Sequence, residues 1–421
     1  MKFRIAIIVD AYSTGSRLAG EFKKLGIDCV HIQSSKDIPF DFLSSYRSED
    51  FINAFVVDEY FTIESMQASL PNKEIICVIP GTETGVETAE RIARKLGLQG
   101  NDPDTSSLRR NKFHMHEALR KARLSWVKQI DCTTVEEAIN WAEAKNIWPL
   151  VAKPTSSAGA DGVMFCHSAE EIRHAARMVI GQSNKLGLKN ESIVLQEQLV
   201  GQQFIVNAVS LNGEHFVSEI WRDDKTPAEG ASLICDREVL LPSQSTFAKS
   251  ISKYVIDCLN VLGITDGPSH SELFQCEDGQ FVLIETAARM QGTIDHKAVI
   301  EATGHSHVTL TALRYAEPDS FATLLGTDYL RRNHLHCVTL CSRETGVVTE
   351  SKVNAKISTL PSFKSLIHTP NVGDQITKTI DLFTNPGIVY LAHHDESILD
   401  KDYDAIRQME INQELFTVST I

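Results

Sequence analysis

The chain of 421 residues lacks several features that assign a protein to a class at sight. No apolar run approaches the roughly 18 residues of a membrane-spanning helix, so we expect no membrane association. The apolar part of the opening MKFRIAIIVDAY is too short for a signal peptide and has no cleavage site. It predicts a buried first strand in a cytoplasmic protein.

Positive charge is scarce too. The chain has 41 Lys and Arg against 55 Asp and Glu, a net charge of −14, which argues against nucleic acid as the main partner. An acidic protein that handles phosphate must concentrate its cations locally. The nine cysteines form no C-x-x-C pair, so in a chain without an export signal we expect reduced thiols.

The common nucleotide and catalytic motifs are also missing. The sequence has no G-x-G-x-x-G after its first strand, no G-x-x-x-x-G-K-[ST], and no kinase H-R-D and D-F-G elements. His116 and Glu117 start like H-E-x-x-H, but Arg120 stands at the place of the second histidine, which excludes that zinc site. No Ser-His-Asp or Cys-His constellation suggests a protein nucleophile.

The first hundred residues alternate between strand and helix patterns. FRIAIIVD, DCVHIQ, AFVVDE and EIICVIPG are typical of buried strands, with helical periodicity between them. This order predicts a doubly wound parallel sheet. The loop DAYSTG, after the first strand, fits either an anion site or an ordinary capped turn. The polar stretch GNDPDTSSLRRN then marks a domain boundary.

Two hairpins carry the chemistry of the second half. Asn212-Gly213 and Asp278-Gly279 each separate two apolar runs and predict two-residue turns. Such a turn at residues 278–279 makes Glu277 face Gln280 and Glu272 face Glu285. Opposed carboxylates have Cβ atoms about 4.5–5.5 Å apart and repel each other. Either one of them points to water, or the register of the strands differs, or the pair binds Mg²⁺ together with phosphate oxygens.

The stretch VAKPTSSAGADGV combines a strand, a lysine and a loop of small residues. Pro154 has no N–H, so the chain leaves the sheet after Lys153. Small residues let backbone amides approach a phosphate closely, and the lysine adds a compact positive charge. We expect a phosphate-binding loop here, although the loop by itself is a weak signal.

The order of these segments resembles the ATP-grasp superfamily over about residues 101–325, and most of all its L-amino acid ligases. The resemblance rests on Lys112 in a helix, VAKPTSSAGADGV, LQEQLVGQQFIVNAVS and HSELFQCEDGQFVLIETAARMQG. It implies a multidomain fold of the α/β and α+β classes. We expect a Rossmann-like pre-grasp domain in residues 1–100, an ATP-grasp domain in 101–330 with a lid at about 125–200, and a small β-rich domain in 331–421.

The resemblance also assigns site residues. The ATP-binding residues are Lys112, Lys153, Ser156, Ser157, Ala158, Gly159, Gly162, Glu197, Leu199 and Gln203. The metal ligands are Glu272 and Glu285, and the substrate residues are His270, Glu272, Arg289 and Gly292. Lys153 and Arg289 act on the transferred phosphoryl group. Two positions depart from the family pattern: Gln203 replaces the glutamate often found at the ribose, and Ala287 replaces an asparagine near the metals.

The implied reaction is ATP-dependent ligation of L-amino acids into a dipeptide, through an aminoacyl phosphate, with release of ADP and phosphate. Mg²⁺ is the implied metal and Mn²⁺ a substitute; amino acids are the partners, antibiotic biosynthesis is the implied context, and a homodimer is one expected assembly. The alternatives are a biotin-carboxylase-like or purine-pathway carboxylating enzyme, and a regulator that binds nucleotide without turnover. Asp223 and Asp224 either pair a basic substrate side chain or belong to a solvated turn.

Overall fold

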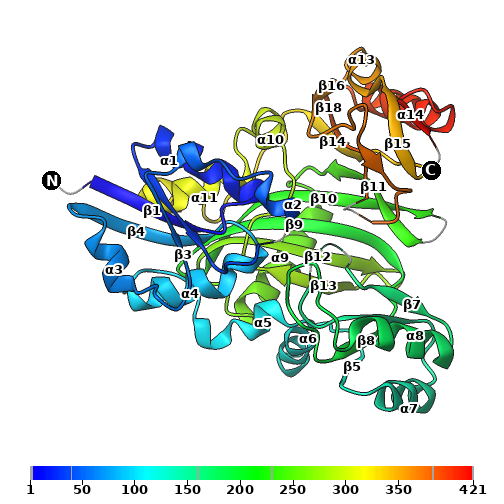
Figure 1. Ribbon diagram of the computed structural model, residues 1–421, viewed down its shortest axis with the longest axis horizontal. Coiled ribbons are helices and arrows are strands. Elements are labelled where there is room, and N and C mark those ends of the chain that lie inside the picture. Colours follow the sequence, from blue (N-terminus) through cyan, green and yellow to red (C-terminus); the bar gives the residue numbers. More distant parts are fainter. Residues whose placement is uncertain are drawn as a thin grey trace.

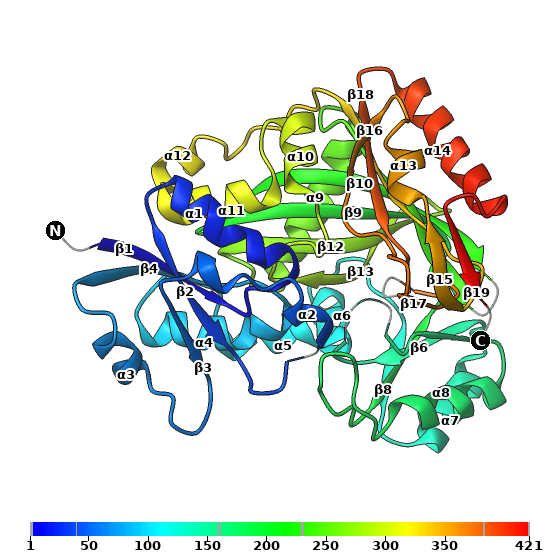
Figure 2. The ribbon, with the colours of Figure 1, turned by 45° about the horizontal axis from the view of Figure 1, so that its top comes forward.

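The structure is a computed structural model that describes residues 3–38, 40–157, 159, 161–228, 231–381 and 384–419. Three lobes surround one large central sheet (Figures 1 and 2). The N-terminal lobe lies at one end of the molecule, and the lid and the C-terminal lobe lie at the other. In the described parts of the chain, no helix is both long and apolar enough to cross a membrane.

The N-terminal lobe contains a four-stranded parallel sheet in the order β3-β2-β1-β4, which confirms the predicted parallel sheet. Its apolar strands are buried on both faces, as a sheet between helices requires. The strands are β1 (Phe3–Val9), β2 (Asp28–Gln33), β3 (Asn53–Val56) and β4 (Lys73–Pro80), and the helices are α1 (Leu18–Lys24), α2 (Phe40–Leu43), α3 (Ile63–Ala68) and α4 (Val86–Lys95).

Helices α5 (Ser107–Arg110) and α6 (Lys112–Lys121) lead into the lid. The side chain of Asn111 accepts hydrogen bonds from the first amides of α6, so Lys112 begins that helix. The lid is a separate antiparallel sheet in the order β5-β8-β6-β7, with its own core against two helices. Its elements are β5 (Gln129–Cys132), α7 (Val135–Lys145), β6 (Leu150–Pro154), β7 (Met164–Cys166), α8 (Ala169–Val179) and β8 (Ile193–Glu197).

The central sheet has eight strands in the order β13-β12-β9-β10-β11-β14-β18-β16. Three of these strands come from the C-terminal lobe, so that lobe continues the sheet of the ATP-grasp region. The elements before that lobe are β9 (Gly201–Leu211), β10 (Glu214–Ala228), β11 (Ala231–Leu240), α9 (Thr246–Val261), β12 (Gly267–Cys276), β13 (Phe281–Ala287), α10 (His296–Thr303), α11 (His307–Ala316) and α12 (Pro318–Ala322).

The C-terminal lobe adds a small three-stranded sheet, β17-β15-β19, and packs α13 and α14 over its own apolar core. This content agrees with the β-rich lobe expected there. Its elements are β14 (His334–Thr339), β15 (Gly346–Ser351), α13 (Val353–Ile357), β16 (Phe363–Leu366), β17 (Gln375–Ile376), β18 (Ile388–His393), α14 (Glu396–Ile411) and β19 (Phe416–Ser419).

The first predicted hairpin is confirmed. Asn212 and Gly213 both have positive φ, 54° and 82°, and Leu211 pairs with Glu214. These angles are the ones a tight two-residue turn between twisted strands requires. The turn therefore fixes the register of β9 against β10.

The second hairpin differs near its turn. The amide of Cys276 donates to the carbonyl of Gln280 at 2.8 Å, so the loop has three residues, with Gly279 at φ 82°. The predicted pairing of Glu277 with Gln280 is therefore wrong. A bulge between the Leu273 and Glu272 pairs restores the register, and Glu272 does face Glu285.

Candidate functional site

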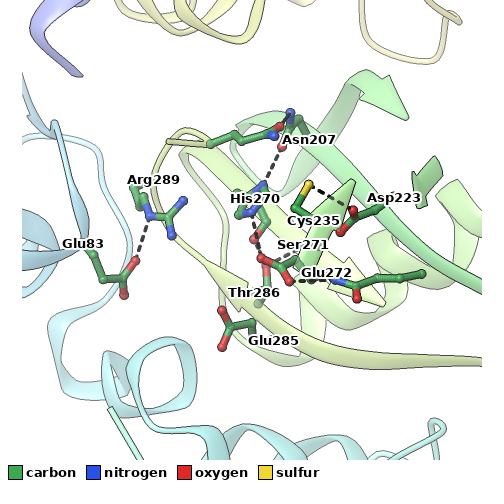
Figure 3. A network of polar contacts seen from close by, with 12 residues as sticks. Glu83, Asn207, Asp223, Cys235, His270, Ser271, Glu272, Glu285, Thr286 and Arg289 are labelled. Carbon is green, nitrogen blue, oxygen red and sulfur yellow. Dashed lines mark hydrogen bonds and ion pairs between the residues drawn. The ribbon is translucent and has the colours of Figure 1, made fainter. Parts of the chain in front are cut away.

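Glu272 on β12 and Glu285 on β13 form the centre of the candidate site (Figure 3). Both side chains are half-buried and belong to directly opposed residues. The Nζ atom of Lys112 lies 2.8 Å from an oxygen of Glu285, so the lysine at the start of α6 balances one of the two charges. The predicted pairing of Glu272 with Glu285 is confirmed.

Glu272 is held by two neighbours. His270 Nε2 lies 3.3 Å from one carboxylate oxygen, and the amide of Gln203 donates to the other at 3.0 Å. Burial would raise the pKa of Glu272, but the His270 hydrogen bond and the charges of His270, Lys225 and Arg289 lower it well below its usual value. The carboxylate is therefore ionised and available to a cation.

His270 is itself oriented by a buried polar network. Asn207 donates its amide to Glu219 at 3.1 Å and to Gln291 at 2.7 Å. Its carbonyl oxygen is left to accept from His270 Nδ1 at 2.9 Å. This arrangement turns Nε2 of the imidazole toward Glu272 (Figure 3).

Lys153 is the last residue but one of β6, since Pro154 still pairs with Ile193, and the Lys153 side chain is buried. Burial and the charge of Lys112 lower its pKa to about 8, against the opposing effect of Glu285 and Glu272. Two lysines thus lie close to two glutamates, in a cluster where each like-charged pair is unfavourable. A bound phosphate would relieve the repulsion between the lysines.

The loop after β6 is tied to the same cluster. Lys112 Nζ donates to the carbonyl of Ser157 at 2.9 Å, and Ser157 Oγ donates to Asp161 at 2.8 Å. Gly162 has φ 67°, and a Cβ there would lie 3.1 Å from the ring of Pro154, so the position favours glycine. Gly159 also has positive φ, at 68°.

Other predicted nucleotide residues are spread along the lid and its edge. The carbonyl of Ser156 accepts from Asn184 at 2.8 Å. Glu197 ends β8 and binds the amide and Nζ of Lys128, while Leu199 lies in the link between the lid and β9. Ala158 lies outside the described residues.

Arg289 follows β13 and contacts a residue that sequence reasoning missed. Its Nε donates to Glu83 at 2.9 Å (Figure 3). Glu83 also pairs with Arg110. Burial would raise the pKa of Glu83, but the two arginines lower it to about 2. Glu83 lies just after the carboxyl end of β4, where a parallel sheet places ligand-facing loops, so the GTETG sequence was the available signal.

Gly292 lies in the loop beyond Arg289, against the DAYSTG loop. The next amide, of Thr293, donates to Ser13 Oγ at 3.3 Å, and the amide of Ile294 donates to Thr14 Oγ1 at 3.2 Å. The DAYSTG loop therefore supports the predicted substrate loop through hydroxyl groups. It is one wall of the same site.

The face of the central sheet that carries Glu272 and Glu285 is the floor of the site, and it continues onto β10. Asp223 is 2% exposed and lies inside the strand, so the solvated-turn alternative is wrong for this residue. Lys225, which sequence reasoning also missed, is 2.7 Å from it. Burial opposes ionisation of Lys225, but Asp223, Cys235 and Glu272 together raise its pKa.

The residues present fit a divalent cation bound together with phosphate. Mg²⁺ takes hard oxygen ligands and is commonly held by one or two carboxylates plus phosphates and water. The opposed, half-buried Glu272 and Glu285 provide that donor set, and the described residues contain no group of three or more His, Cys, Asp or Glu able to hold a metal alone. A closed, all-protein metal site is therefore not what these residues form.

Comparison with known proteins finds related sequences and structures. Residues 147–296 match the model of the ATP-grasp domain. The chain is 27% identical over 409 residues to dapdiamide A synthase of Enterobacter agglomerans, covering 96% of each chain. It is 24% identical over 220 residues, about half of each chain, to an L-arginine-specific L-amino acid ligase of Bacillus subtilis.

Solved structures show the same fold. An L-amino acid ligase from Bacillus licheniformis superimposes with a TM-score of 0.77 at 18% identity, with all of both chains covered. A biotin carboxylase domain from Hydrogenobacter thermophilus, solved with MgADP and bicarbonate, gives 0.65 at 16% identity over all of this chain and 91% of that one. Together with the ATP-grasp domain match at residues 147–296, these findings show the ATP-grasp fold, and the chain is similar to dapdiamide A synthase and to L-amino acid ligases.

Proposed function

We propose that this protein joins two L-amino acids into a dipeptide at the expense of ATP. The observation that carries the proposal is the cross-strand pair Glu272–Glu285 with Lys112 and Lys153 beside it. Two like-charged pairs at one place are costly unless a ligand of complementary charge binds there. A nucleoside triphosphate with a divalent cation has that charge pattern.

The first step activates the carboxylate of one amino acid. Transfer of the γ-phosphoryl group of ATP gives an aminoacyl phosphate and ADP, and the amine of a second amino acid then displaces phosphate. In the proposal, Lys112, Lys153 and the loop residues Ser156, Ser157, Ala158, Gly159 and Gly162 bind the phosphates. Glu197 and the backbone of Leu199 meet the adenine, and Gln203 meets the ribose.

The remaining residues handle the cation and the amino acid. Glu272 and Glu285 hold Mg²⁺, or Mn²⁺ in its place, which neutralises charge on the phosphates when it is bound. Arg289 stabilises the transferred phosphoryl group. His270, Glu272 and Gly292 orient the first amino acid, and Glu83 fixes the direction of Arg289. No protein nucleophile is required.

The test is release of ADP and phosphate in the presence of each of the twenty amino acids, singly and in pairs. The proposal predicts release that depends on an amino acid and yields a peptide. Release that depends on bicarbonate instead would indicate a carboxylating ATP-grasp enzyme. Nucleotide binding without any release would indicate a regulator. Size-exclusion chromatography with light scattering tests the proposed homodimer.

A further inference from the structure

A second pair of opposed carboxylates lies further along the floor of the site. Asp223 on β10 faces Glu238 on β11, and Asp223 also faces Gln203 on β9. Directly opposed residues share a face of a sheet, so Glu238 lies on the same face as Gln203, whose amide binds Glu272. The floor is therefore a band of polar side chains on one face of the sheet, in which Gln203, diagonal to Glu272, joins the Glu272–Glu285 pair to Asp223 and Glu238.

Each of the other carboxylates of this band lies beside a basic side chain: Glu285 beside Lys112, Glu272 beside His270 and Asp223 beside Lys225. Glu238 is held differently. Its Oε2 accepts a hydrogen bond from Gln291 at 3.1 Å, while Asp223 holds Lys225 at 2.7 Å. Among the described residues, no ion pair is formed by Glu238. A half-buried carboxylate without a cation of its own attracts one from a ligand.

The surroundings of Glu238 oppose its ionisation. Burial, then Asp223, raises its pKa to about 8, Glu272 adds to this effect, and Lys225 and the Gln291 hydrogen bond act against it. The other titratable groups that face it are Cys235 on its own strand, Cys337 on β14 and Tyr390 on β18, whose pKa values are raised. A carboxyl group with such a pKa holds its proton at pH 7 in the free enzyme, and the positive charge of a bound ammonium group favours its carboxylate form.

Gln291 links Glu238 to the reaction centre. It stands two residues after Arg289, and its carbonyl oxygen accepts from Asn207, which orients His270. Glu238 is thus joined through one side chain to the residues that face the proposed acyl phosphate. It lies three strands away from Glu272, outside the set of residues assigned to ATP and the metal.

We propose that Glu238, positioned by Gln291, binds the ammonium group of the second amino acid and removes its proton before the attack. The inference rests on the proposed ligase function and names the group that handles the incoming amine. It assigns a carboxylate to a substrate that must arrive as a cation.

In the proposed step, the ammonium group of the second amino acid gives one proton to the Glu238 carboxylate and becomes a neutral amine. Its lone pair forms the C–N bond at the acyl carbon, the C–O bond to the phosphoryl group breaks, and phosphate leaves with that electron pair. The departing phosphate takes the second N–H proton, and Glu238 returns its proton to solvent.

Hydroxylamine separates this role from ATP and donor binding, because it is an uncharged nucleophile at neutral pH and needs no base. We expect E238Q to form aminoacyl hydroxamate and ADP at near the wild-type rate. Dipeptide formation should fall about 10²-fold at pH 7 and recover as the pH is raised toward the range where the free amine forms. E238D, which keeps the carboxylate, should retain part of the dipeptide activity. E214Q, at an exposed glutamate at the start of β10, is the matched control and should match the wild type in both assays.

An E238Q variant that makes dipeptide at the wild-type rate would overturn the proposal. So would an equal loss of hydroxamate and dipeptide in a variant that unfolds at the wild-type temperature. The wild type gives a test that needs no folded variant: between pH 9 and pH 7 its dipeptide rate should fall more steeply than its hydroxamate rate, and parallel profiles would contradict the role of Glu238. If the wild type forms no hydroxamate and releases no ADP with any amino acid, the ligase proposal itself fails.

Discussion

Two regions of this molecule bury charged groups, and they do so in opposite ways. Where the N-terminal lobe meets the central lobe, Arg109 is fully buried and binds Glu90, the hydroxyl of Thr105 and the carbonyls of Asp102 and Leu262. Arg314 likewise pairs with the Asp266 carboxylate. Each charge there has an opposite partner inside the protein.

The floor of the site has the ion pairs Lys112–Glu285 and Lys225–Asp223, but it also places like charges next to one another. Glu272 faces Glu285, Asp223 faces Glu238, and Lys153 has its pKa lowered partly by Lys112. Such arrangements cost folding free energy, whereas a completely paired arginine does not leave an unmet charge. The difference indicates which buried charges stabilise the fold and which await ligands, and the variants below test it.

The largest effect is expected from removing the metal ligands. The double variant E272Q/E285Q should lose turnover by about 10³-fold, because charge on the phosphates is no longer neutralised. Its thermal unfolding temperature should stay within a few degrees of wild type, since the change removes the carboxylate repulsion as well as the Lys112 pair. Coupled ADP release and differential scanning fluorimetry measure the two quantities. Chelation of divalent cations should reproduce the activity loss in the wild type.

Removing the Arg109–Glu90 ion pair should lower stability and leave activity unchanged, the reverse of the result expected for E272Q/E285Q. R109A leaves Glu90 buried without its cation and should lower the free energy of unfolding by about 3–5 kcal/mol. Activity per folded molecule should be unchanged, because Arg109 touches no proposed substrate group. Urea unfolding followed by circular dichroism measures the loss. An R109A variant as stable as the wild type would remove the distinction between the two regions.

Glu83 should show an intermediate effect, because it acts through Arg289. E83Q weakens the ion pair that fixes the guanidinium, and we expect kcat to fall about 10-fold with little change in the KM for ATP. E87Q is the matched control, since Glu87 also approaches Arg110, at 3.8 Å, but is exposed. Steady-state kinetics measure kcat and the KM for ATP in both variants. An equal fall in the kcat of E83Q and E87Q would refute the positioning role of Glu83.

An effect of similar size, confined to high pH, is expected at Lys153. Its pKa of about 8 lies below the ordinary 10.5, so the lysine is charged at pH 7 but loses its proton in the free enzyme as the pH rises. The KM for ATP should therefore increase about 10-fold between pH 7 and pH 9, and K153R, which stays charged, should show no such rise.

The same pKa has a consequence for folding with the opposite sign. Between about pH 8 and 10.5 the unfolded chain binds more protons at this lysine, so its contribution to the free energy of unfolding increases with pH. Below pH 8 the buried charge costs stability in full. A KM for ATP that does not change with pH, together with a flat contribution to stability, would mean that Lys153 is not the buried cation described here.

Short-range patterns in the sequence predicted much of the fold. Alternating strands and helices gave the parallel sheet, and Asn212-Gly213 gave the first hairpin, because turn geometry fixes register over short distances. The predicted pairing of Glu272 with Glu285 is confirmed, although the predicted two-residue turn at 278–279 is wrong. A three-residue turn and a bulge each shift the register by one, and the two shifts cancel.

The rest depends on contacts that no local pattern encodes. Glu83 reaches Arg289 across 206 residues, and Glu238 joins the floor only through the register of β11 against β10. Nothing in the sequence near Glu238 marks it as part of a site. Its place in the site follows from strand pairing, which brings Glu238, Asp223 and Gln203 from three strands to one face of the sheet.

The most direct test of the central claim follows an oxygen atom. With ¹⁸O in the carboxylate of the first amino acid, an aminoacyl phosphate intermediate must carry one labelled oxygen into the phosphate released with ADP. We predict one ¹⁸O atom per phosphate during dipeptide synthesis by the wild type, and neither product nor label transfer with E272Q/E285Q. Phosphate free of ¹⁸O while dipeptide accumulates would contradict the account.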